Sequence, residues 1–231
     1  MKSLVVDYRI SKKSLNTLED LGYKIIKTQK ELGVQDAICG HPDIVLCKLK
    51  NHDCVAKTTF RGFLNNETEC NVIEGNSILG KDYPFDIAYN AALVGNNLFC
   101  NEKYTDIAIL NYCRANNIKI INVNQGYAKC SICIVSDNAI ITADKNISVA
   151  ANKNNIDVLL IENKGVILKG YNEGFFGGAT GLIEKDLLAV NGNIELHKDC
   201  NRIKRFCANY GVNVLSLSDE PIYDIGSIIR L

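Results

Sequence analysis

Apolar and polar residues alternate along this chain in a pattern that recurs. Segments 86–100, 130–142 and 180–190 each consist of an apolar stretch, a short polar turn and a second apolar stretch. Their turns contain Gly, Asn and Asp, which tight hairpin turns favour. We therefore predict three β-hairpins here, and a fourth over residues 43–57.

A helix is predicted after each hairpin. The clearest one has apolar residues at the i, i+3, i+4 and i+7 spacing of one buried helix face: Ile203, Phe206, Cys207 and Tyr210. Gly211 is placed to end this helix. Asp106 and Asp144 precede two shorter helical patterns and are predicted to be their N-caps.

Each predicted helix is followed by another apolar strand. These strands cover residues 21–28, 116–123, 154–161 and 210–217, with a fifth over 69–75. The chain is thus a repeat of one strand–turn–strand–helix–strand unit. First strands begin near residues 43, 86, 131 and 181, so the period is roughly 40 to 50 residues.

The first unit lacks its opening strand, because residues 3–8 lead directly into a helical pattern. A lone apolar strand over 226–231 has nothing after it. We predict that these two strands pair and close five ββαβ units into a ring, which removes an open sheet edge. The fold class expected is α+β, with residues 1–231 forming one domain.

Composition excludes several classes of function. The 231 residues carry 26 basic and 26 acidic side chains, so net charge provides no basis for binding nucleic acid or an anionic membrane. The apolar run near residue 4 is too short for a signal peptide or a membrane span, and we expect a cytoplasmic protein. The glycine-rich segment 174–181 lacks a nucleotide fingerprint, and no cofactor is expected.

The ten cysteines are expected to be reduced, because disulfide-dense scaffolds are usually small secreted chains. Only Cys130 and Cys133 have the spacing of a metal or redox pair. We place both in one strand, where their side chains would point to opposite faces. The sequence therefore predicts no metal site.

Five motifs carry a resemblance to a known fold. They are HPDI (41–44), YPFDIAYN (83–90), QGYAKCSICIV (125–135), GFFGGATG (174–181) and SLSDEPIYDIGSI (216–228). Together with the repeat, they resemble the pentein, or guanidine-modifying-enzyme, fold superfamily. Its members include arginine and agmatine deiminases, dimethylarginine hydrolases, amidinotransferases and a ribosome anti-association factor. The motifs are most similar to an uncharacterised clostridial family with this fold.

The resemblance implies a pentein-like α/β propeller of five pseudo-symmetric units, with a ligand in the central channel. In the enzymes, a cysteine near the C-terminal strand attacks the guanidinium carbon, a histidine serves as acid and base, and carboxylates hold the cation. The matching segment 224–231 offers Ser227 and Arg230 but no cysteine. The resemblance therefore implies that the usual covalent chemistry is absent.

The candidate residues follow from these placements. Weak catalytic candidates are Cys130 and His41, although an ordinary junction histidine explains His41 equally well. The expected ligand-binding residues are His41, Asp43, Asp86, Asn90, Thr180, Asp224, Ser227 and Arg230. His52 is expected to be exposed in a hairpin turn, and His197 is expected to cap a helix or lie at the surface.

The function predicted is a small-molecule-binding or regulatory protein that lacks the cysteine and histidine of the guanidine hydrolases. Its ligand would be a small polar or cationic molecule in the central channel. One alternative is an amidinohydrolase-like or deiminase-like enzyme with Cys130 as nucleophile and His41 or Asp86 nearby. Another is a macromolecular interaction protein that resembles the anti-association factor.

Overall fold

The computed structural model describes residues 2–50 and 52–231. The fold is a mixed α+β fold, as predicted. Within these residues the chain forms seven α-helices, two 3₁₀ helices and 17 short strands.

Five three-stranded sheets have the same internal order, in which the middle strand pairs antiparallel with one neighbour and parallel with the other. The sheets are β17–β1–β2, β3–β4–β5, β6–β7–β8, β9–β10–β11 and β13–β14–β15. Their strands are β1 (Ser3–Val6), β2 (Lys24–Lys27), β3 (Leu46–Lys48), β4 (Asp53–Lys57), β5 (Asn71–Gly75), β6 (Ala92–Val94), β7 (Asn97–Cys100), β8 (Lys119–Asn122), β9 (Ile132–Ser136), β10 (Ala139–Thr142), β11 (Asp157–Leu160), β13 (Thr180–Glu184), β14 (Leu187–Val190), β15 (Asn213–Ser216) and β17 (Ile229–Arg230). A separate parallel pair joins β12 (Val166–Ile167) to β16 (Ile222–Tyr223).

One helix connects the two parallel strands of each sheet. These helices are α1 (Lys12–Asp20), α3 (Thr58–Leu64), α4 (Ile107–Ala115), α6 (Lys145–Asn152) and α7 (Cys200–Asn209). The predicted caps are confirmed: the Asp106 carboxylate accepts from the backbone N–H of Ala108, and Asp144 accepts from two N–H groups of α6. Gly211 follows α7 with φ of +71°.

The predicted hairpins are present, but three first strands begin later than expected. They start at Leu46, Ala92 and Ile132 instead of near 43, 86 and 131. Two short helices, α2 (Pro42–Val45) and α5 (Ala128–Ser131), and the 3₁₀ helix η1 (Gly177–Ala179) precede first strands. A further 3₁₀ helix, η2 (Ile194–Leu196), precedes α7. Cys130 therefore lies in α5 and not in a strand, so its predicted placement is wrong.

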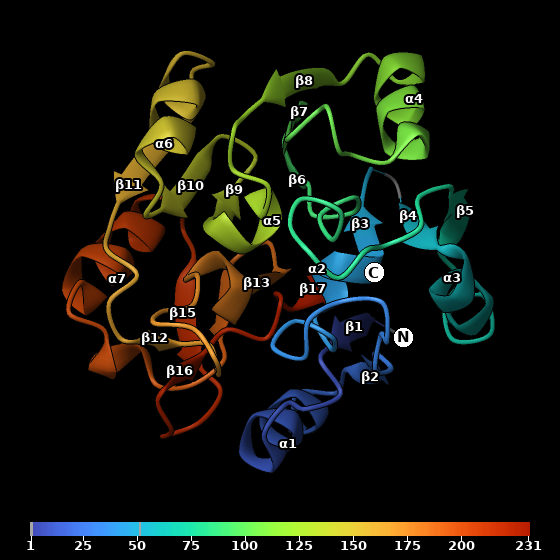
Figure 1. Ribbon diagram of the computed structural model, residues 1–231. Helices are drawn as coiled ribbons and strands as arrows, with labels where there is room; N and C mark the ends of the chain where they lie inside the picture. Colours follow the sequence, from blue (N-terminus) through green and yellow to red (C-terminus); the bar gives the residue numbers. More distant parts are fainter. Residues whose placement is uncertain (1, 51) are drawn as a thin grey trace.

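The predicted pairing between the two ends of the chain is confirmed. Strand β17 runs antiparallel to β1, with Leu4 opposite Arg230 and Val5 opposite Ile229. First strands of successive sheets also contact one another, β3 with β6, β6 with β9, β9 with β13 and β13 with β17. Figure 1 shows the five sheets placed around the centre of the molecule. The described residues contain no closed sheet, and fivefold closure stays a prediction.

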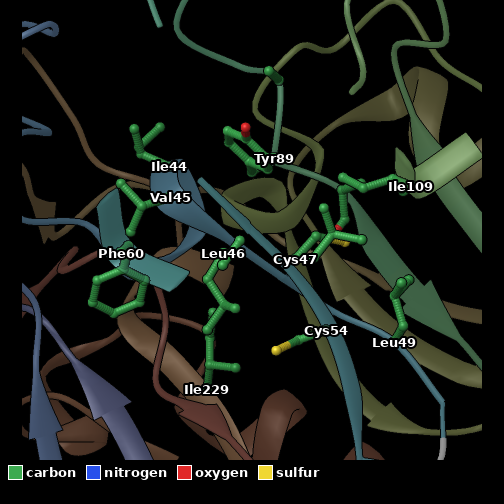
Figure 2. Close-up of a cluster of buried hydrophobic side chains, with 14 of the residues drawn as sticks. Ile44, Val45, Leu46, Cys47, Leu49, Cys54, Phe60, Tyr89, Ile109 and Ile229 are labelled. Atoms are coloured by element: carbon green, nitrogen blue, oxygen red, sulfur yellow. The ribbon is translucent and has the colours of Figure 1, made fainter. Parts of the chain in front are cut away.

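Among the described residues, buried apolar side chains form four clusters, and one of them includes residues of β3 and β4 (Figure 2). Ile44, Val45 and Leu46 enter this cluster from α2 and the start of β3, and Ile229 enters it from β17. The second unit is thereby packed against the closing strand. All ten cysteines are free and buried, and Cys47 and Cys54 lie in this cluster as small apolar side chains.

No helix of the described segments has the length and apolar character needed to cross a membrane.

Candidate functional site

Short helical turns at the starts of three first strands bring polar residues to the centre of the molecule. In Figure 1, α2 lies beside β17 near this centre, and α5 lies next to β9. The backbone N–H of Asp43 donates to the carbonyl oxygen of Gly226 at 3.2 Å, which joins α2 to the closing segment. Pro42 stands at the first turn of α2, where its missing N–H costs no hydrogen bond.

Two glycines allow the backbone to approach this centre closely. A Cβ atom at Gly178 would lie 2.1 Å from Oδ1 of Asp224, and one at Gly226 would lie 2.2 Å from Cβ of His41. Gly226 also has φ of +66°, which side chains rarely adopt. The glycine-rich segment 174–181 is thus a close-packed junction against Asp224.

Cys130 is buried and held by two polar side chains. Its Sγ lies 3.0 Å from Oδ2 of Asp43, to which the thiol donates, and it accepts from Nδ2 of Asn90 at 3.4 Å. Oδ1 of Asn90 accepts from the backbone N–H of Lys129 at 2.8 Å and from that of Cys130 at 3.3 Å. Asn90 therefore fixes both the α5 turn and the thiol on it.

Ser227 links the closing segment to the same carboxylate. Its Oγ donates to Oδ2 of Asp43 at 3.0 Å, and it accepts from the ammonium group of Lys129 at 2.9 Å. Ser227 is fully buried, with φ of +73°. A chain of hydrogen bonds therefore runs from Lys129 through Ser227 to Asp43.

His41 and Asp224 complete the cluster. Nδ1 of His41 lies 3.9 Å from Oδ1 of Asp224, and both side chains are about 1% exposed. The backbone N–H groups of Phe175 and Gly226 donate to Asp224 at 2.8 and 3.0 Å. Neither ring nitrogen of His41 has a hydrogen-bond partner, and Oδ1 of Asp43 has none either.

Burial decides the protonation of the cluster. It raises the pKa of the Cys130 thiol well above its ordinary value, and the charges of Asp43 and Asp224 raise it further. Burial lowers the pKa of His41, against the effect of the Asp224 charge. It raises the pKa of both carboxyl groups, while hydrogen bonds from Cys130 and Ser227 oppose this at Asp43. At neutral pH the site therefore contains a protonated thiol and a neutral imidazole.

A cavity of about 450 Å³ lies along the first strands and is lined by residues of β3, β6, β9, β13 and β17. Lys48, Lys129 and Arg230 line it, together with one acid, Asp137. Nη1 of Arg230 is already paired with Glu184 at 3.0 Å. The cavity is therefore predominantly basic, in contrast to the acidic cluster beside it.

The structure brings together six of the residues singled out from the sequence: His41, Asp43, Asn90, Cys130, Asp224 and Ser227. Thr180 and Arg230 line the cavity instead. Asp86 is buried elsewhere and accepts from the Tyr127 hydroxyl at 2.6 Å. Asp219, in the loop before Asp224, is exposed and paired with Lys13.

The remaining histidines lie outside the cluster. His52 is exposed, as predicted. His197 is buried rather than at the surface. Its Nδ1 accepts from the backbone N–H of Asp199, the residue before α7, and no side-chain capping bond is made at the start of α7.

Sequence reasoning missed Lys129. Its ammonium group reaches Ser227 and its side chain lines the cavity, so it joins the two features. The available signal was its position immediately before Cys130. A lone lysine in a four-residue turn has no periodicity that would separate it from a surface residue.

Comparisons with known proteins place the chain among proteins of this architecture. A model described as "Family of unknown function (DUF6873)" matches residues 5–229. A search of curated protein sequences finds no significant match.

Solved structures give the fold likeness. The amidinotransferase SxtG of Microseira wollei is 11% identical with a TM-score of 0.56, and the match covers 94% of this chain and 88% of that one. The DDAH of Pseudomonas aeruginosa, complexed with citrulline, is 7% identical with a TM-score of 0.59, over 94% and 92% of the two chains. The inosamine-phosphate amidinotransferase of Streptomyces griseus is 10% identical with a TM-score of 0.51, over 95% and 88%. At these identities the likeness concerns the fold, which agrees with the pentein resemblance.

Proposed function

The chain belongs to the family of unknown function (DUF6873), and we propose that it binds a small polar molecule in its central channel without cysteine-dependent hydrolysis of guanidines. The observation that carries this proposal is the cavity of about 450 Å³ lined by first strands of all five three-stranded sheets. A concave site with a few convergent polar groups is the usual form of a small-molecule site.

The charges of the cavity favour one class of ligand. Lys48, Lys129 and Arg230 supply positive charge, and Asp137 supplies a single negative charge. A carboxylate would pair with these basic side chains by charge-assisted hydrogen bonds, whereas a ligand with only positive charge would be repelled by them. The DDAH with the similar fold is complexed with citrulline, which carries a carboxylate. We therefore propose an amino-acid-like amidino or ureido compound.

The absence of hydrolysis rests on the segment before β17. This segment contains Ser227 and no cysteine, and the Ser227 hydroxyl already donates a hydrogen bond to Asp43. A serine nucleophile needs an adjacent base that accepts its proton. The carboxyl group nearest to Ser227 is that of Asp43, which is fully buried and also accepts a hydrogen bond from the Cys130 thiol. Burial raises the pKa of Asp43 and so favours its protonated form, which cannot accept the serine proton.

A second candidate function is an enzyme that uses Cys130. One specific observation favours it: ligand atoms of Cys130, His41 and Asp224 lie within 4.8 Å of one another. Burial and the neighbouring carboxylates hold the pKa of the thiol well above its ordinary value, so the reactive thiolate is disfavoured. Turnover abolished by Cys130→Ala would promote this candidate. The macromolecular-interaction alternative stays an untested prediction.

We propose further that residues 1–231 form one pentein-like domain, an α/β propeller closed by β17. The β1–β17 pairing supports closure. Units related by rotations of about 72° in a crystal structure would establish it, and a ring of only four related units would contradict it.

Isothermal titration calorimetry tests the binding proposal. We expect citrulline or arginine to bind more tightly than agmatine, which lacks the carboxylate. Lys129→Met should weaken binding about tenfold or more, because a charged hydrogen bond contributes about 1.5–3 kcal/mol. Lys185→Met, in an exposed hairpin turn, is the matched control. Equal affinity for agmatine, or an unchanged affinity in Lys129→Met, would contradict the proposal.

A further inference from the structure

The buried cluster next to the channel contains metal-ligand atoms of three kinds. An imidazole nitrogen of His41, Sγ of Cys130 and a carboxylate oxygen of Asp224 all lie within 4.8 Å of one another. The three residues come from the turn before α2, from α5 and from the segment before β17. They are 2%, 3% and 5% exposed.

A second observation concerns unpaired polar atoms. Both ring nitrogens of His41 and Oδ1 of Asp43 are buried without a hydrogen-bond partner. Buried polar groups are normally paired, because an unpaired one costs about 1–3 kcal/mol. A cation in this cluster would accept the lone pair of one ring nitrogen of His41.

We propose that His41, Cys130 and Asp224 supply three ligands to a divalent metal ion of borderline softness, best represented by Zn²⁺, with water in the fourth position. Nitrogen, sulfur and oxygen ligands in a four-coordinate site are typical of zinc. Zinc bonds of about 2.0–2.3 Å place tetrahedral ligand atoms roughly 3.3–3.8 Å apart. The separation of 3.9 Å between Nδ1 of His41 and Oδ1 of Asp224 is close to this range.

The surrounding groups fit this assignment. Asn90 donates to the Cys130 sulfur, Ser227 donates to Asp43, and two backbone N–H groups donate to Asp224. Such outer contacts orient metal ligands and tune their basicity. They leave the ring nitrogens of His41 unpaired, so one of them is free to bind the ion.

The charges also balance. When the ion binds, the Cys130 thiol releases its proton to solvent, so the thiolate and two carboxylates carry three negative charges. Zn²⁺ contributes two positive charges, and the ammonium group of Lys129, hydrogen-bonded to Ser227, contributes one. Asp224 also lines a second cavity of about 470 Å³.

This inference goes beyond the proposed function, because it concerns a metal ion in the buried cluster and not an organic ligand in the cavity. Its test therefore uses metal ions alone. The full chain, stripped with a chelator, is titrated with Co²⁺ and then with Zn²⁺. We expect one ion per chain and a thiolate-to-cobalt charge-transfer band, which Zn²⁺ abolishes by displacement. Cys130→Ala should remove the band and weaken Zn²⁺ binding by more than the roughly 10- to 100-fold that outer-shell changes cause.

Cys133→Ala is the matched control, because Cys133 is also buried but packs in an apolar cluster. It should keep the band, and circular dichroism should show that both variants are folded. If Cys130→Ala does not fold, His41→Gln takes its place; it should weaken Zn²⁺ binding and shift the band. A wild-type protein without the band, a band that survives Cys130→Ala, or a band lost equally in both cysteine variants would overturn the proposal.

Discussion

The hydroxyl of Ser227 donates to Oδ2 of Asp43 at 3.0 Å, although the two residues are 184 positions apart in the chain. This bond joins the segment before β17 to the α2 turn of the second unit. It also places a serine, and no thiol, beside the carboxylate at the centre of the molecule. The contact between the two ends of the chain's fold and the polar cluster therefore involve the same residue, Ser227, next to β17.

Ser227→Ala tests the energetic weight of this bond. The variant leaves the buried Asp43 carboxyl with one donor fewer, so we expect a loss of about 1–3 kcal/mol in the free energy of unfolding. Alanine and serine experience similar strain at positive φ, and the comparison isolates the hydroxyl. Urea denaturation measures the change, with Ser148→Ala at a half-buried position of α6 as the control. A loss no larger than the control's would show that the bond contributes little.

Removal of residues 226–231 should destabilise the whole chain. The truncation deletes β17, exposes the edge of β1 and removes Ile229 from the largest apolar cluster. Ile229→Ala, a milder change, should cost about 2–5 kcal/mol. Thermal unfolding measures both variants; an unchanged Tm after truncation would contradict the closing role of β17.

Much of this arrangement could be predicted from the sequence. The Asp106 and Asp144 caps follow from local rules, because capping geometry is a property of short segments. The β1–β17 pairing follows from the repeat, because the first unit lacks an opening strand and the last strand has none after it. The short helices α2 and α5 before β3 and β9 could not be predicted, since each is four residues long and has no helical periodicity.

The site was predictable only in part. The junction motifs indicated that His41, Asp43, Asp224 and Ser227 face one centre. The contact of Cys130 with Asp43 depends on packing between units 87 residues apart, which no local pattern reports. Cys130 was wrongly placed in a strand because the mostly apolar segment 130–135 gives no sign that the strand β9 begins only at Ile132.

The stability of the protein should fall as the pH drops below about 6.5. Burial lowers the pKa of His197 from its ordinary value of 6.5, and its Nδ1 must stay unprotonated to accept from Asp199. Below that value the unfolded chain binds a proton that the folded chain does not, so acid favours unfolding. His41 acts in the same direction, whereas Asp43 and Asp224, with raised pKa values, act in the opposite one.

His197→Asn isolates the contribution of this histidine, because the asparagine oxygen can accept the same hydrogen bond without titrating. Urea denaturation at pH 7.5 and 5.5 should show a smaller acid-induced loss in His197→Asn than in the wild type. Identical losses in both proteins would assign the acid sensitivity to other groups.

The protein should not convert arginine, agmatine or methylated arginines into products. Residues 224–231 contain no thiol, and burial holds the pKa of the Cys130 thiol well above its ordinary value. Citrulline, ammonia and urea released from a panel of guanidines measure the activity. Turnover that Cys130→Ala abolishes and Cys133→Ala preserves would instead establish an enzyme that uses Cys130.

Electron density in the central channel tests the main claim most directly. The protein is purified from its own host, without added ligand, and crystallised. We predict density for a small polar molecule in the cavity lined by Lys48, Lys129 and Arg230, with an anionic group against the bases. A cavity filled only by ordered water, together with no calorimetric binding of citrulline or arginine, would contradict the account.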